Sequence, residues 1–195
     1  MALALLYAYR QRMEQGRNNK IMENDLYSRI VRERGSLERL GEKLPGFRGY
    51  MEMSARRQAD RMIREHVAKQ LQEQLSRLVN IEKMLLDAGG LSYMSKTRSA
   101  KTKFQTFIDR IASDTAGYSG FFDAVKIGED DLAVVYSFDA ALLDYVTKFS
   151  TALDALESAA ATNEAVDEKI RALDALTIEA NQAYSLRENV LMDIK

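Results

Sequence analysis

The sequence contains no cysteine and no tryptophan, and it has a single proline and a single histidine among its 195 residues. Without cysteine the chain can form no disulfide framework, thiolate zinc site, iron–sulfur cluster or cysteine nucleophile. The lone histidine, His66, excludes every site that needs two imidazole ligands. The scarcity of proline favours long uninterrupted helices, because proline disrupts a helix interior more than any other residue.

The sequence also lacks any apolar run of the roughly 20 residues that a membrane-spanning helix needs. The first nine residues are apolar, but positive charges follow this run instead of preceding it, which is the reverse of a secretory signal. These charges are Arg10, Arg12, Arg17 and Lys20. We therefore expect a cytoplasmic protein. Its N-terminal stretch is expected to pack on its own bundle or on a second subunit, with an amphipathic membrane anchor as the alternative.

Apolar side chains make up 46% of the sequence and charged ones 29%. This balance is typical of a folded domain and argues against a disordered chain. A chain of this length is expected to form one ordinary domain that buries about 70% of the surface of its unfolded form. The sequence thus predicts a single domain over residues 1–195.

The net charge of −1 hides a strong polarity along the chain. Residues 1–110 hold 22 basic and 13 acidic side chains, a balance of +9, whereas residues 111–195 hold 6 and 16, a balance of −10. Such asymmetry indicates either an electrostatic partner for one half or two halves that face each other. The simpler interpretation is that basic helices pack beside acidic ones within one chain.

Residues 26–44 show the three- and four-residue apolar spacing of a helix with a heptad-like face. The apolar positions are Leu26, Ile30, Leu37, Leu40 and Leu44. Gly35 weakens this helix. Pro45 then ends it, because a residue before proline is disfavoured in the helical conformation, and Gly46 and Gly49 allow a sharp bend.

Four further stretches, at about 50–87, 92–116, 129–161 and 164–193, carry the same spacing. Asp139 is the one polar interruption in the apolar face between Leu132 and Leu156. Residues 132–136 have β propensity, but they lie within this helical pattern and are assigned to helix. The sequence therefore predicts an all-α fold, an elongated antiparallel bundle of four long helices in residues 48–195 with an N-terminal helical segment in residues 1–44.

Two corners rich in glycine and aromatic residues, at 46–50 and 117–122, separate these helices. The helix lengths place both corners near the same end of the bundle. Their side chains either close that end or form a small recognition surface. The candidate binding residues are Phe47, Arg48, Tyr50, Tyr118, Phe121 and Phe122.

Basic residues occupy much of the second predicted helix and continue into the third. The candidate basic face consists of Arg56, Arg57, Arg61, Arg64, Lys101 and Lys103. Such a face could bind the phosphates of nucleic acid or anionic lipid, or it could pair with the acidic helices that follow. We expect no nucleic-acid binding, because the pI is near 6.0 and no aromatic residues alternate with the basic ones.

The motifs of common catalytic and metal sites are missing. No Glu-x-x-His pair offers a di-iron site, and no glycine-rich loop of the phosphate-binding type is present. Ser119 lacks both the full nucleophile elbow and a preceding strand. The acidic residues at 123–131 lack the spacing of a calcium loop and suit a helix N-terminus. We expect no catalytic residues, metal or cofactor, and His66 at the edge of an apolar helix face.

The leading hypothesis is a non-enzymatic helical interaction or assembly protein, an adaptor or scaffold that self-associates or binds a protein partner through its helix faces and polarised charges. The alternative is a peripheral protein that binds or remodels anionic membranes. Its charge layout is similar to that of ESCRT-III-type membrane-remodelling proteins, in which a basic helical hairpin precedes an acidic part. A third hypothesis is a small-molecule enzyme or sensor that uses the aromatic corners.

Overall fold

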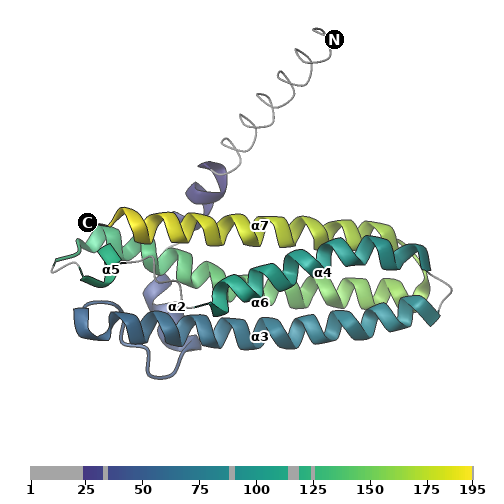
Figure 1. Cartoon of the computed structure of the whole chain (residues 1–195), viewed down its shortest axis with the longest axis horizontal. Coiled ribbons are helices and arrows are strands. Elements are labelled where there is room, and N and C mark those ends of the chain that lie inside the picture. Colours follow the sequence, from purple (N-terminus) through teal and green to yellow (C-terminus); the bar gives the residue numbers. More distant parts are fainter. Residues whose placement is uncertain (1–23, 33–34, 88–90, 114–118, 124–125, 195) are drawn as a thin grey trace, which may run out of the picture.

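The computed structural model of the protein describes residues 24–32, 35–87, 91–113, 119–123 and 126–194, and within these ranges it contains helices and no strand (Figure 1). This confirms the all-α prediction. A helix over residues 24–31 opens the described chain. It is followed by α2 (Ser36–Lys43), α3 (Met53–Asp87), α4 (Leu91–Ala112), α5 (Ser119–Asp123), α6 (Glu129–Thr162) and α7 (Val166–Asp193).

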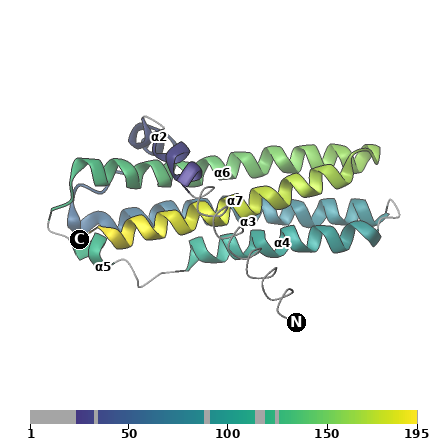
Figure 2. The same cartoon turned by 90° about the horizontal axis from the view of Figure 1, so that it is seen from above.

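The four long helices form two hairpins that lie side by side. Within each hairpin, α3 with α4 and α6 with α7, the helices are antiparallel, as predicted for sequential neighbours. The hairpins pack with α3 against α6 and α4 against α7, and the pairs between hairpins run parallel (Figures 1 and 2). The end of α4, the short helix α5 and the start of α6 therefore lie at the end of the bundle where α3 begins.

A row of ion pairs joins α4 to α7 along their parallel run. Lys96, Lys103 and Arg110 lie seven residues apart on α4, and their acidic partners on α7 follow one another at seven and then fourteen residues. The pairs are Lys96–Asp167 at 2.6 Å, Lys103–Asp174 at 2.7 Å and Arg110–Glu188 at 2.5 Å. The basic and acidic halves of the sequence thus face each other within one chain.

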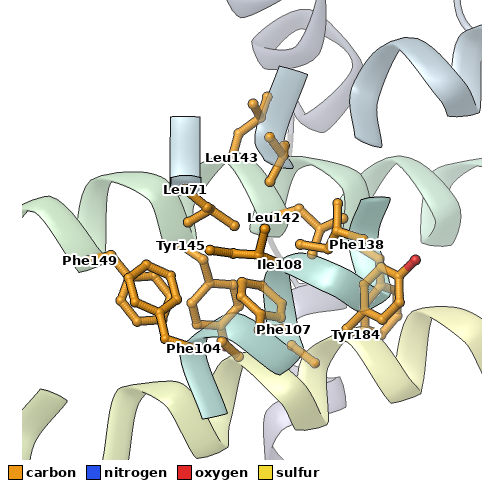
Figure 3. Close-up of a cluster of buried hydrophobic side chains, with 14 of the residues drawn as sticks. Leu71, Phe104, Phe107, Ile108, Phe138, Leu142, Leu143, Tyr145, Phe149 and Tyr184 are labelled. Carbon is orange, nitrogen blue, oxygen red and sulfur yellow. The ribbon is translucent and has the colours of Figure 1, made fainter. Parts of the chain in front are cut away.

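Aromatic side chains fill the centre of the bundle (Figure 3). The rings of Phe104 and Phe149 stack with centroids 4.0 Å apart, and Phe107 lies edge-on to Tyr145 at 6.1 Å. These contacts cross the diagonal between α4 and α6. Within the described residues, the apolar faces of the four long helices are largely buried against one another.

The N-terminal helical segment differs from the prediction, because Gly35 adopts a positive φ of 72° and separates the helix at 24–31 from α2. In α2 and directly after it, Ser36, Leu40 and Leu44 are buried, whereas Leu37 is 42% exposed. The prediction of a single buried apolar face from residue 26 to residue 44 is therefore wrong at Leu37. Both pieces lie on the outside of the bundle, and α2 packs on α6 (Figure 2).

Candidate functional site

The two corners meet at one end of the bundle, as the helix lengths predicted. The ring of Tyr50 lies 5.1 Å from Phe121, 5.8 Å from Phe47 and 5.5 Å from Tyr136 of α6. Phe122 lies 5.1 Å from Phe121. Tyr50 and Phe121 are fully buried, so this part of the corner closes the bundle end.

The remaining corner residues have different positions. Phe47 is half-buried and Arg48 is exposed. Tyr118 lies outside the described residues, as do residues 1–20 with their predicted docking role. The structure thus brings four of the six candidate binding residues, Phe47, Tyr50, Phe121 and Phe122, into one cluster, and it leaves Arg48 at the surface beside them.

A buried network of charges lies beneath the aromatic cluster and joins three helices. Arg187 of α7 donates to Asp139 of α6 through Nε at 2.6 Å and to Asp60 of α3 through Nη2 at 2.7 Å. The hydroxyl of Tyr50 donates to the other oxygen of Asp139 at 2.7 Å. The side chains of Arg187, Asp139 and Asp60 are all nearly inaccessible to solvent.

Two residues of the predicted basic face belong to this interior and not to the surface, which corrects the sequence interpretation. Arg56 donates to the carbonyl oxygens of Tyr50 and Phe121 at 3.0 and 3.1 Å. Arg64 donates to Asp60 at 2.7 Å and to carbonyl oxygens at the end of α4. Both arginines are buried because they satisfy carbonyl groups that the chain leaves without helical partners at its corners.

The charges in the network perturb one another's pKa values. Burial alone would raise the pKa of Asp60, but Arg187 and Arg64 outweigh it and hold that pKa below its ordinary value. Burial dominates at Asp139 and raises its pKa, although Arg187 and Tyr50 oppose the shift. Burial also raises the pKa of the Tyr50 hydroxyl, and Asp139 adds to the shift. Tyr50 therefore stays a neutral donor.

The opposite pKa shifts of Asp60 and Asp139 predict opposite effects on stability in acid. A lowered folded pKa contributes stability above the ordinary aspartate pKa, and that contribution is lost as the pH falls through the folded value; a raised pKa has the reverse effect. We expect the stability difference between wild type and Asp60→Asn to shrink on acidification, and that between wild type and Asp139→Asn to grow. Urea unfolding from neutral to acidic pH measures both differences.

Each variant leaves Arg187 with one aspartate, but Asp60→Asn also removes the partner of Arg64, so the test compares the change of each difference with pH and not its absolute size. Differences that change in the same direction with pH would contradict the assignment of the two shifts.

The rest of the predicted basic face is divided among pairs within the chain. Lys101 pairs with the buried Glu82 at 2.5 Å, and Lys103 belongs to the row between α4 and α7. The guanidinium of Arg57 lies over the ring of Phe122 at 4.6 Å and 3.4 Å from Asp123. Arg61 is exposed on α3. The six residues therefore do not form one continuous phosphate-binding surface.

An open groove lies beside the corner, between α2 and the first turns of α6. It has a volume of about 650 Å³, and its surface is mainly apolar. The apolar side chains in its lining include Val31, Leu37, Met51, Leu132 and Val134. Three exposed acidic side chains also line it, and they are called its acidic rim below, namely Glu38, Glu129 and Asp130. The sequence did not predict this groove, because it placed Leu37 on an apolar helix face, whereas Leu37 is 42% exposed and lines the groove.

Met51 separates the groove from a second, more polar hollow of about 500 Å³. The second hollow is lined by the loop that holds Phe47 and Arg48 and by the first turns of α3. Met51 lines both hollows and is 68% exposed. The corner therefore presents exposed apolar surface next to its closed aromatic cluster.

Sequence reasoning also missed Arg187 and Asp60. A signal was present, because both occupy positions on the apolar faces of their helices. Arg187 lies three residues after the buried Tyr184 and four before the buried Leu191, and Asp60 lies three residues before the buried Ile63. Together with Asp139, each of three helices thus carries a charge where its pattern requires an apolar residue.

The described residues offer no group of three or more His, Asp or Glu side chains that could hold a metal ion. His66 is half-buried beside the apolar face of α3, as predicted. None of the described helices is both long and apolar enough to cross a membrane. Comparisons of the chain with protein-family models, with curated proteins and with solved structures find no match.

Proposed function

We propose that this chain is a non-enzymatic helical interaction and assembly protein, an adaptor or scaffold that self-associates through the groove between α2 and α6. The groove is the observation that carries the proposal. It collects apolar side chains at the surface, including Leu37 at 42% and Met51 at 68% exposure. Exposed apolar patches with a polar rim are typical of contact sites for other polypeptides.

The position of the charges supports this groove over the contacts expected from sequence. Self-association through the long apolar faces or through paired basic and acidic halves loses its basis, since both are used inside the chain. The groove keeps an acidic rim at Glu38, Glu129 and Asp130. Such a rim favours a basic amphipathic segment and disfavours an anionic surface. The proposed compartment is the cytoplasm, an expectation that cell fractionation tests.

Changing Leu37 to glutamate is expected to weaken self-association at least tenfold, because it places a charge on the apolar wall of the groove next to an acidic rim. Leu86→Glu is the matched control, because Leu86 is 43% exposed and lies near the opposite end of α3. Sedimentation velocity of the full chain over a range of concentrations measures both variants. Circular dichroism checks that the helices are retained.

Self-association of the wild type and of Leu86→Glu, but not of Leu37→Glu, supports the proposal. A wild-type chain that stays monomeric at every concentration and salt level overturns it. Flotation with anionic and neutral vesicles tests the membrane alternative. Binding that needs anionic lipid and is unaffected by Leu37→Glu would replace the groove proposal with peripheral membrane binding.

A further inference from the structure

We infer that the segment held in the groove is the N-terminal stretch, residues 1–20, of a second copy of this chain; this inference rests on the proposed function. The stretch has the two chemical properties that the groove requires. Its first part is apolar, with Leu3, Leu5, Leu6, Tyr7 and Tyr9, and its second part is basic, with Arg10, Arg12, Arg17 and Lys20. The groove offers apolar walls and an acidic rim in turn.

The charges of the stretch and of the groove are opposite in sign. Apolar side chains from residues 3–9 can cover the walls formed by Leu37 and Val134. The basic residues that follow then meet the carboxylates at the rim, Glu38, Glu129 and Asp130. Interfaces of this kind gain affinity from the apolar contacts and orientation from the charged edge.

The helix at 24–31 favours a second copy over the chain's own stretch. It is anchored to the bundle, because Leu26 and Ile30 are buried, Tyr27 lies 5.6 Å from the ring of Phe138, and Arg29 lies 3.6 Å from Glu179. Its last residue, Val31, lines the groove. Its first residue is therefore about 10 Å from the groove, at 1.5 Å per residue.

To enter its own groove, the stretch before residue 24 would have to reverse direction. Glycine and proline make such reversals easiest, and the residues before Gly35 hold a single glycine, Gly16, and no proline. A second copy has no such constraint. If each copy donates its stretch to the other, the contacts are identical and the assembly closes as a dimer with two-fold symmetry.

The absence of cysteine makes a direct test possible, because any introduced thiol pair is the only one present. Full-length Leu6→Cys is mixed with full-length Leu37→Cys, the two chains carrying different affinity tags, and the mixture is oxidised mildly. We expect a disulfide-linked species that contains both tags. Leu6→Cys mixed with Leu86→Cys is the control and should yield little of it.

The double variant Leu6→Cys/Leu37→Cys separates the two possible origins of the stretch. Cross-linked dimers and longer species support exchange between copies, whereas an intrachain bond in a monomer overturns the inference. The variant Leu5→Glu/Leu6→Glu should lose self-association to the same extent as Leu37→Glu.

The outcomes distinguish this inference from the function it rests on. Self-association that is lost in Leu37→Glu but kept in Leu5→Glu/Leu6→Glu overturns the N-terminal occupant and leaves the groove as the contact site. A wild-type chain without self-association overturns both.

Discussion

Replacing Arg187 with methionine is expected to lower the free energy of unfolding by about 3–5 kcal/mol, which is the usual cost of breaking a buried ion pair. The guanidinium forms ion pairs with both Asp60 and Asp139, and both carboxylates are buried. The two carboxylates also outweigh burial and raise the pKa of Arg187 above its ordinary value, so it stays a cation. Without the guanidinium, Asp139 loses its ion pair and keeps the hydrogen bond from the hydroxyl of Tyr50.

Urea unfolding at neutral pH measures the change. Arg77→Met is the control, since Arg77 also bridges two acidic residues, Asp154 and Glu157, but does so at the surface. Exposed ion pairs contribute about 0–1 kcal/mol, so the control should lose no more than that. Equal losses in the two variants would contradict the assigned role of burial.

A triple variant separates the cost of an unpaired charge from the loss of packing. Tyr50→Phe/Asp139→Leu/Arg187→Met replaces the polar groups together and keeps the pair between Asp60 and Arg64. Replacing a buried ionic set by apolar groups of similar size is often neutral or stabilising. We therefore expect the triple variant to be more stable than Arg187→Met alone. A triple variant less stable than the single one would show that packing, and not charge, dominates at this position.

Changing Gly49 to alanine is expected to lower the free energy of unfolding by about 2–4 kcal/mol, through two effects. Gly49 has a positive φ of 80°, which costs about 1–2 kcal/mol for a residue with a side chain. An added Cβ would lie 2.7 Å from the hydroxyl oxygen of Tyr136. That oxygen accepts a hydrogen bond from the backbone N–H of Tyr50 at 2.8 Å. Losing such a buried hydrogen bond lowers the free energy of unfolding by a further ~1–2 kcal/mol.

Two other glycines of the same region serve as controls. Gly46 has a φ of 88° but open space around its Cβ position, so Gly46→Ala should show only the backbone cost. Gly41 lies inside α2 with nothing near it, and Gly41→Ala should stabilise the chain by about 0.5–1 kcal/mol. Near-ultraviolet circular dichroism reports the tyrosine packing directly, because the chain lacks tryptophan. Equal effects at Gly46 and Gly49 would contradict the clash with Tyr136.

The long helices were predictable because each repeats one pattern over many turns. The predicted start of the third long helix after Gly128 agrees with α6, which begins at Glu129 and carries three acidic residues in its first turn, where they favour a helix N-terminus. The convergence of the corners followed from helix lengths alone. Both predictions depend on the spacing of apolar residues along each helix, which can be read directly from the sequence.

The interior charges were less predictable, because arginine and aspartate are mostly exposed in folded proteins. Arg56 and Arg64 were assigned to the surface on residue type, although their spacing places them on the buried face of α3. The parallel packing of the two hairpins depends on contacts between distant segments, such as Arg77 with Asp154. Local patterns do not specify such contacts. The groove likewise joins residues far apart in the sequence, from 31–38, 51 and 129–137.

The buried charges also govern how the two hairpins align along their length. Asp60 belongs to one hairpin, whereas Asp139 and Arg187 belong to the other. Sliding one hairpin past the other by a single helical turn, about 5.4 Å, would carry Arg187 away from Asp60. Apolar layers by themselves tolerate such slippage, since one leucine resembles the next. Because Arg187 must pair with aspartates of both hairpins, every misaligned packing leaves a buried charge without its partner. The ion pairs therefore select one register between the two hairpins.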